Sequence, residues 1–213
     1  MQQILVYGDS LTWGIIPGSR QRLPFDQRWP IVMEGELVAA GRSVRVIEDA
    51  LNGRRTVWED PFKAGRSGVA GLEQRIEVNS PLALVLVMLG TNDFQSMHDH
   101  NAWHAAQGVA ALVRAIRRAP IEPGMPSPRV AVICPPLPGT AKGEMAEKFR
   151  GAERKSVGLL EAYRQMTHDL ECHLFDASAI ITTSAVDGVH LDAPQHGVLG
   201  KALARAVCAW LPA

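Results

Sequence analysis

Short apolar runs alternate with longer stretches of helical periodicity along most of the chain. The apolar runs that fit single buried strands are residues 4–7, 44–47, 82–89, 130–134 and 174–175. The stretches whose apolar residues recur at helical spacing are residues 29–40, 103–118, 144–170 and 195–211. Strands rich in Val, Ile and Leu that alternate with helices predict a parallel sheet covered by helices on both faces.

Three polar or proline-rich segments interrupt this alternation, at residues 17–27, 120–128 and 135–138. Proline and glycine end regular elements, so these segments are expected to be loops on the surface. We interpret them as surface loops or as contacts between subunits. No linker or repeat divides the chain. With 213 residues, we expect one domain over residues 1–213.

The charge balance excludes some classes of partner. Lys and Arg together number 22, as do Asp and Glu, so a nucleic acid or an anionic membrane is not expected as the main partner.

No apolar run is long enough to span a membrane, and Met1-Gln2-Gln3 begins no basic leader. The three cysteines, Cys134, Cys172 and Cys208, form neither a disulfide framework nor a zinc pattern. A cytoplasmic location is therefore expected.

Chemically active residue types follow several of the predicted strands. Ser10 follows the first strand, Gly53 the second, Asn92 the third, and Asp187 and His190 the last. In a parallel sheet the carboxyl ends of the strands lie at one edge, where ligands bind. The sequence therefore predicts that these five residues meet there.

Acyl transfer needs these residue types together. A serine hydroxyl becomes a nucleophile when a base such as His190 takes its proton, and Asp187 can hold the imidazole in the required tautomer. The N–H groups of Ser10 and Gly53 and the amide of Asn92 can stabilise an oxyanion. Each residue alone fits a turn or a helix cap equally well. The ordered set favours catalysis.

The sequence resembles the SGNH hydrolases, also called the GDSL esterase/lipase family. The residues that carry the resemblance are Gly8-Asp9-Ser10-Leu11, Gly53, Gly90-Thr91-Asn92-Asp93 and Asp187-Gly188-Val189-His190-Leu191. The resemblance runs from about residue 4 to the last helix. It implies a flavodoxin-like three-layer α/β/α sandwich with a five-stranded parallel sheet. It also implies a catalytic triad of Ser10, Asp187 and His190, and an oxyanion hole of Ser10, Gly53 and Asn92.

Within that family the chain is most similar to the bacterial arylesterase and acyltransferase branch. The similar stretches are residues 8–14, 46–49, 56–61 and 87–93. The resemblance implies an esterase with some acyl transfer to alcohols, and a homo-oligomer. Short-chain esters are the expected substrates, and neither a cofactor nor a metal is expected. The known acyltransferase of the branch has a second tryptophan where this chain has Ile15, so weaker transfer is expected. A carbohydrate acetylesterase, a thioesterase and a non-catalytic binding module are the alternatives.

Bulky side chains near the proposed catalytic residues suggest a shallow, apolar acyl pocket. The candidates are Leu11, Trp13, Ile15 and Val189, for which core packing is an equal alternative.

Two further features are weaker. His100 and His104 have the i, i+4 spacing of a helical metal site, but no third ligand is evident. Arg54 and Arg55 are expected in a solvated loop, with contact to a polar group of the substrate as the alternative.

Overall fold

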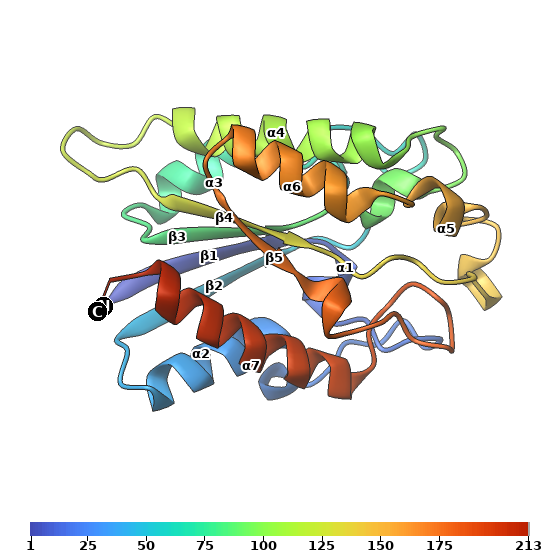
Figure 1. Cartoon of the computed structure of the whole chain (residues 1–213), viewed down its shortest axis with the longest axis horizontal. Coiled ribbons are helices and arrows are strands. Elements are labelled where there is room, and N and C mark those ends of the chain that lie inside the picture. The colour runs from blue at the N-terminus through green and yellow to red at the C-terminus, as the bar shows by residue number, and fades with distance from the viewer. Residues whose placement is uncertain (213) are drawn as a thin grey trace.

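Five parallel strands form the central sheet of the computed structural model, which describes residues 1–212. They are β1 (Gln2–Gly8), β2 (Val44–Ala50), β3 (Leu84–Met88), β4 (Arg129–Cys134) and β5 (His173–Asp176). Their order across the sheet is β2-β1-β3-β4-β5, and each neighbouring pair is parallel (Figure 1). The predicted three-layer fold and its parallel sheet are therefore confirmed.

Helices cover both faces of this sheet. The helices α3 (Leu72–Asn79), α4 (Ala102–Arg118) and α6 (Leu159–Asp169) lie on one face, and α2 (Trp29–Ala39) and α7 (Ala193–Trp210) on the other (Figure 1). Successive side chains of a strand point to opposite faces. Leu5 and Tyr7 accordingly join one core cluster, and Ile4 and Val6 join the other.

Short helical turns connect these elements and shape the loops at the sheet edge. They are α1 (Ser10–Trp13), α5 (Ala152–Lys155), η1 (Phe25–Gln27), η2 (Thr91–Phe94), η3 (Gly143–Met145) and η4 (Ala177–Ala179).

Two helical predictions need correction. The stretch 144–170 is not one helix but η3, α5 and α6, because Gly151 and Gly158 have φ values of 79° and 84°. Such left-handed positions favour glycine and interrupt an α-helix. The sequence reading also omitted α3, which buries only Leu72 and Ile76.

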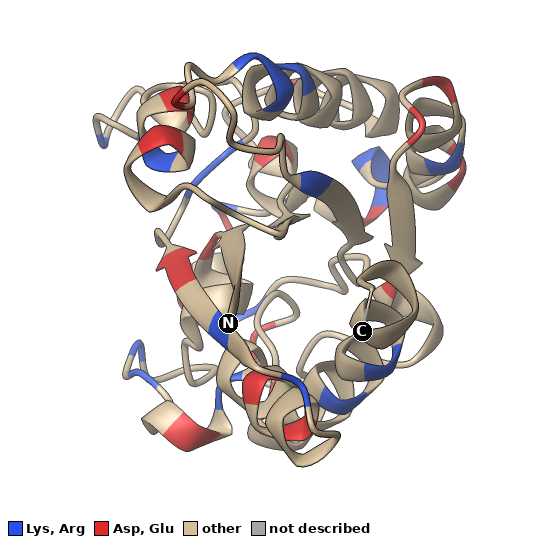
Figure 2. Ribbon diagram, turned by 90° about the vertical axis from the view of Figure 1, so that its left-hand side faces the viewer, with Lys and Arg blue, Asp and Glu red and all other residues tan. Residues whose placement is uncertain are grey.

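The surface agrees with the balanced composition. Figure 2 shows basic and acidic residues interspersed over the ribbon rather than gathered into one stripe. No helix within residues 1–212 has the length and apolar character needed to cross a bilayer.

Candidate active site

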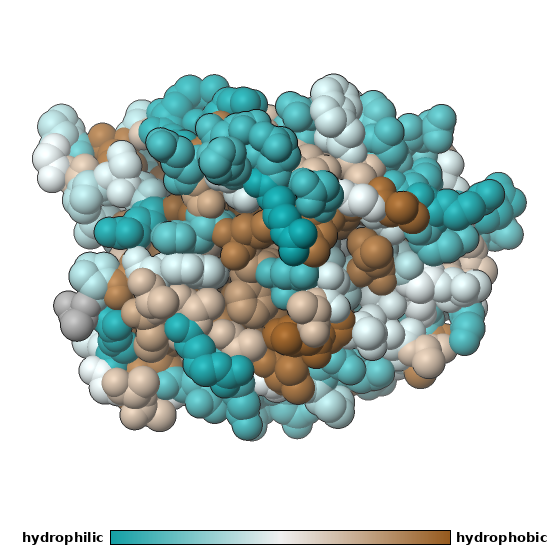
Figure 3. Space-filling model, in the orientation of Figure 1, coloured by the Kyte–Doolittle hydropathy of each residue, from teal (hydrophilic) through white to brown (hydrophobic). Residues whose placement is uncertain are grey.

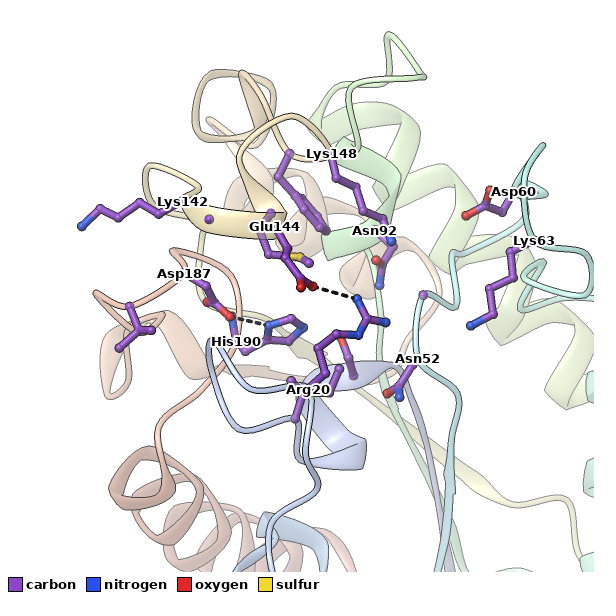
Figure 4. Close-up of a pocket in the computed structure, with 18 residues that line it drawn as sticks. Arg20, Asn52, Asp60, Lys63, Asn92, Lys142, Glu144, Lys148, Asp187 and His190 are labelled. Atoms are coloured by element: carbon purple, nitrogen blue, oxygen red, sulfur yellow. Dashed lines mark hydrogen bonds and ion pairs between the residues drawn. The ribbon is translucent and has the colours of Figure 1, made fainter.

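Four loops at the carboxyl edge of the sheet bring the predicted site residues together. Ser10, Gly53, Asn92, Asp187 and His190 all line one cavity of about 250 Å³ (Figure 4). Parallel strands with right-handed crossovers bring these loops to one edge, although the residues span most of the sequence.

The backbone around Ser10 is tightly held. Asp9 precedes α1, and its Oδ1 accepts a hydrogen bond from the Leu11 N–H at 2.9 Å. A Cβ at Gly8 would lie 2.1 Å from Oγ1 of Thr12, so the turn from β1 into α1 needs glycine there. Ser10 itself is 6% exposed and faces the cavity.

Asp187 and His190 form a preorganised pair on the loop before α7. Oδ2 of Asp187 lies 2.7 Å from Nδ1 of His190. The other carboxylate oxygen, Oδ1, accepts the N–H groups of Val189 and His190, both at 2.9 Å. Because Nδ1 faces Asp187, Nε2 is the ring nitrogen left to exchange a proton with a neighbour.

These contacts decide the charge of Asp187. Burial alone would raise its pKa, but the hydrogen bonds from the His190 ring and from the two backbone N–H groups outweigh it, and the pKa of Asp187 is about 2. The carboxylate therefore stays ionised at neutral pH and can stabilise a protonated imidazole.

The Asn92 amide is fixed on both sides. Its Nδ2 donates to Oδ2 of Asp9 at 2.8 Å and to the carbonyl oxygen of Arg54 at 3.2 Å. Its Oδ1 accepts from Nε2 of Gln95 at 2.7 Å. Gln95 therefore fixes which end of the amide is the donor, and the NH₂ group lies on the side of Asp9 and the Ser10 turn.

Two buried carboxyls connect the loops beneath the cavity. Burial raises the pKa of Asp9 to about 6 and that of Asp93 to about 7. Asp93 accepts hydrogen bonds from the Thr56 N–H at 3.0 Å and from its hydroxyl at 2.5 Å, and so joins the loop after β3 to the loop after β2. Asp9 thus caps the turn into α1 and also contacts Asn92.

The two arginines beside Gly53 do not lie in a solvated loop, contrary to expectation. Arg54 and Arg55 are 2% and 0% exposed. Arg54 donates to Oδ1 of Asp49 at 2.8 Å, and its guanidinium lies 3.9 Å from the centre of the Tyr7 ring. The two arginines anchor the loop that holds Gly53, whose φ of 82° favours glycine.

The residues expected around the acyl pocket divide into two groups. Ile15 lines the cavity. Leu11 and Val189 pack instead into opposite halves of the core, each 1% exposed, because their backbone positions direct them beneath the turns. Trp13 is half-buried under the Arg22 guanidinium, 4.6 Å from its ring centre, and is not part of the lining.

The sequence reading did not assign the charged residues of the cavity. Arg20, Lys63, Lys142, Glu144 and Lys148 all line it. Most belong to the excursion after α1 and to the segment around η3. The polar character of both segments was visible in the sequence, but which of their side chains line the cavity was not.

The rings of His98, His100 and Trp58 form an aromatic stack. The His100 ring lies 4.1 Å from the Trp58 ring and 4.8 Å from the His98 ring. Within residues 1–212, no group of three or more His, Cys, Asp or Glu side chains is arranged to hold a metal ion.

Comparisons with known proteins place this geometry in a family. Residues 6–198 match the GDSL-like Lipase/Acylhydrolase family. An inhibitor-bound aryl esterase of M. smegmatis superposes with a TM-score of 0.93 and 31% identity, covering 99% of this chain and 100% of that one. A carbohydrate acetylesterase from Sinorhizobium meliloti gives a TM-score of 0.92 and 32% identity, with the same coverage.

A lipase/acylhydrolase from Enterococcus faecalis, at 18% identity and a TM-score of 0.70, covers 100% of this chain and 98% of that one and shares the fold. A comparison with curated protein sequences finds no match. The family match over nearly the whole chain and the similar esterases together show that the protein is an acylhydrolase of the SGNH, or GDSL-like lipase/acylhydrolase, family.

Proposed function

We propose that the protein is a serine esterase that hydrolyses short-chain carboxylic esters through an acyl-serine intermediate. The observation that carries the proposal is the Asp187–His190 pair, whose 2.7 Å contact lies on the same cavity as Ser10, Gly53 and Asn92. A carboxylate-oriented imidazole beside a serine and a set of N–H donors is the arrangement that acyl transfer needs.

The proposed steps assign one task to each group. His190 Nε2 takes the proton of the Ser10 hydroxyl as Oγ attacks the ester carbonyl. Asp187 stabilises the resulting imidazolium. The N–H groups of Ser10 and Gly53 and the Asn92 amide donate to the oxyanion. His190 then gives its proton to the leaving alcohol, and water attacks the acyl-enzyme by the reverse sequence.

The preference for short acyl groups rests on the size of the cavity. A volume of about 250 Å³ lies below the roughly 300–1,000 Å³ of pockets that hold drug-sized ligands. Charged side chains share the lining with Ile15, so the cavity is less apolar than the acyl pocket that the sequence suggests. Hydrolysis is accordingly proposed as the main outcome, and acyl transfer to an alcohol as a minor one.

Deacetylation of a sugar is the second candidate, because the acetylesterase from Sinorhizobium meliloti is 32% identical to this chain. A panel of aryl acetates, acetylated sugars, thioesters and aryl esters of increasing acyl length separates these substrates. Benzyl alcohol added to the vinyl acetate reaction measures transfer against hydrolysis.

Covalent labelling tests the nucleophile. A fluorophosphonate probe is expected to label Ser10, since the probe needs an activated serine hydroxyl. Ser10→Ala should lose both the label and the esterase activity, as measured by peptide mass spectrometry and aryl acetate hydrolysis. Undiminished labelling of Ser10→Ala at another serine would contradict the assignment.

A further inference from the structure

One wall of the cavity carries an ammonium group that no carboxylate neutralises. Lys148 is half-buried and follows η3, and its Nζ makes no hydrogen bond or ion pair within residues 1–212. Burial lowers the pKa of Lys148, and the negative charge of Asp60 partly opposes this lowering. A half-buried ammonium loses hydration and regains that free energy when an anion binds beside it.

The carboxylates of the lining are already paired within the protein. The pairs are Asp187 with His190 at 2.7 Å, Glu144 with Arg20 at 3.4 Å, and Asp60 with Arg55 at 3.1 Å. None of them is therefore left to neutralise Lys148.

The two other lysines of the lining differ from Lys148. Nζ of Lys142 donates to the Ala185 carbonyl oxygen at 2.9 Å, and its side chain points away from the cavity in Figure 4. Lys63 is exposed at the rim. Lys148, by contrast, extends toward the Asn92 side of the cavity in Figure 4. The positive charge without a partner is thus held beside the proposed oxyanion donors.

Apolar side chains make up much of the rest of the lining. They are Ile15, Met145, Phe149 and Val186. A ligand that fits this lining combines a short apolar part with a negative charge.

From this distribution of charge, and resting on the serine esterase function proposed above, we propose that the substrate is an ester that carries a carboxylate, which Lys148 binds. The ester carbonyl would occupy the Ser10–Asn92 end while the carboxylate pairs with the Lys148 ammonium. Because one small cavity holds both groups, only a short spacer can separate them. Lys63 at the rim adds a second positive charge that attracts the anion.

Matched substrates test this proposal. With the carboxylate on the alcohol side, 4-acetoxybenzoate is compared with its neutral amide, 4-acetoxybenzamide. With the carboxylate on the acyl side, monomethyl glutarate is compared with methyl 5-amino-5-oxopentanoate. The quantity measured is the ratio of kcat/KM for the anionic ester to kcat/KM for its neutral partner, at low and at high salt.

In the wild type we expect a ratio of about ten or more for at least one pair, which corresponds to about 1.4 kcal/mol. This ratio should fall as salt screens the charges. Lys148→Met should lower it toward one, leaving only the weaker attraction of Lys63 at the rim, and Lys148→Arg should restore most of it because the charge returns. The matched control, Lys142→Met, should keep the wild-type ratio, since that ammonium is engaged elsewhere.

The outcomes separate this proposal from the esterase proposal. Equal rates on the anionic and neutral members of both pairs in the wild type would overturn the carboxylate preference and leave the esterase function standing. A high ratio that persists in Lys148→Met would overturn the role of Lys148. Failure to hydrolyse any ester in the panel would refute the esterase function, and the carboxylate preference with it.

Discussion

At the residue scale, the site depends on hydrogen bonds that fix each donor and acceptor in advance. Asn92 shows this most clearly, because Asp9, Arg54 and Gln95 hold its amide from three directions. The contacts to Asp9 and Gln95 hold the amide in place, and an oxyanion would take the proton that Asn92 donates in the longer, 3.2 Å contact to the Arg54 carbonyl oxygen.

Replacing Asn92 measures this effect. Asn92→Ala is expected to lower kcat by about 10²–10³-fold and to change KM little, because the lost donor acts mainly on the transition state. Steady-state kinetics on an aryl acetate give both constants, and circular dichroism with urea unfolding shows whether the variant folds. A folded variant with nearly wild-type kcat would show that the amide has a structural role alone.

At the element scale, the close packing of α2 against α7 supports the face of the sheet below the site. Gly200 of α7 lies against α2, where a Cβ would be 2.7 Å from Cβ of Val32 and 2.8 Å from the Trp29 carbonyl oxygen. His196 of α7 accepts the N–H of Trp29 at 3.3 Å. Burial, together with the nearby Arg28, lowers the pKa of His196 to about 4, so its ring is a neutral acceptor at neutral pH.

A pair of glycine substitutions in α7 tests this contact. Gly200→Ala is expected to lower the free energy of unfolding by about 1–3 kcal/mol, because the added methyl forces the two helices apart. Gly197→Ala is the control in the same helix. No atom lies within 4 Å of a Cβ there, so the variant should gain roughly 0.5–1 kcal/mol from helix propensity. Urea denaturation measures both, and equal effects of the two variants would contradict the packing argument.

At the scale of the whole molecule, several large apolar side chains reach the surface. Figure 3 shows apolar atoms across the middle of one face. Among the large apolar side chains, Ile180 and Val198 are 41% and 46% exposed. Phe62 and Trp103 are 83% and 61% exposed. Exposed apolar surface of this kind is common at subunit interfaces.

We therefore expect the protein to form a homo-oligomer. An isologous dimer, alone or as the unit of a larger ring, is the commonest closed arrangement. Light scattering at micromolar concentration should give a multiple of the 23.1 kDa chain mass. A single species at the monomer mass would rule out self-association.

Sequence alone predicted the five strands and most of the helices between them in chain order, though not α3, and it named the proposed catalytic residues. Both rest on local signals, namely apolar runs for buried strands and short motifs such as the one around Ser10 at the strand ends. The sequence carries only a weak signal that the helix is interrupted at Gly151 and Gly158. A glycine can continue a helix or end it, and its φ decides which.

Tertiary structure decided everything that depends on contacts between distant segments. Burial of Leu11 and Val189, the anchoring of Arg54, and the arrival of Lys148 at the cavity all join residues far apart in the chain. The periodicity of a sequence says which face of an element is apolar, but not which loop will meet another. The unpaired charge beside the proposed oxyanion site is therefore a property of the folded chain alone, because it depends on which carboxylates the fold has already paired.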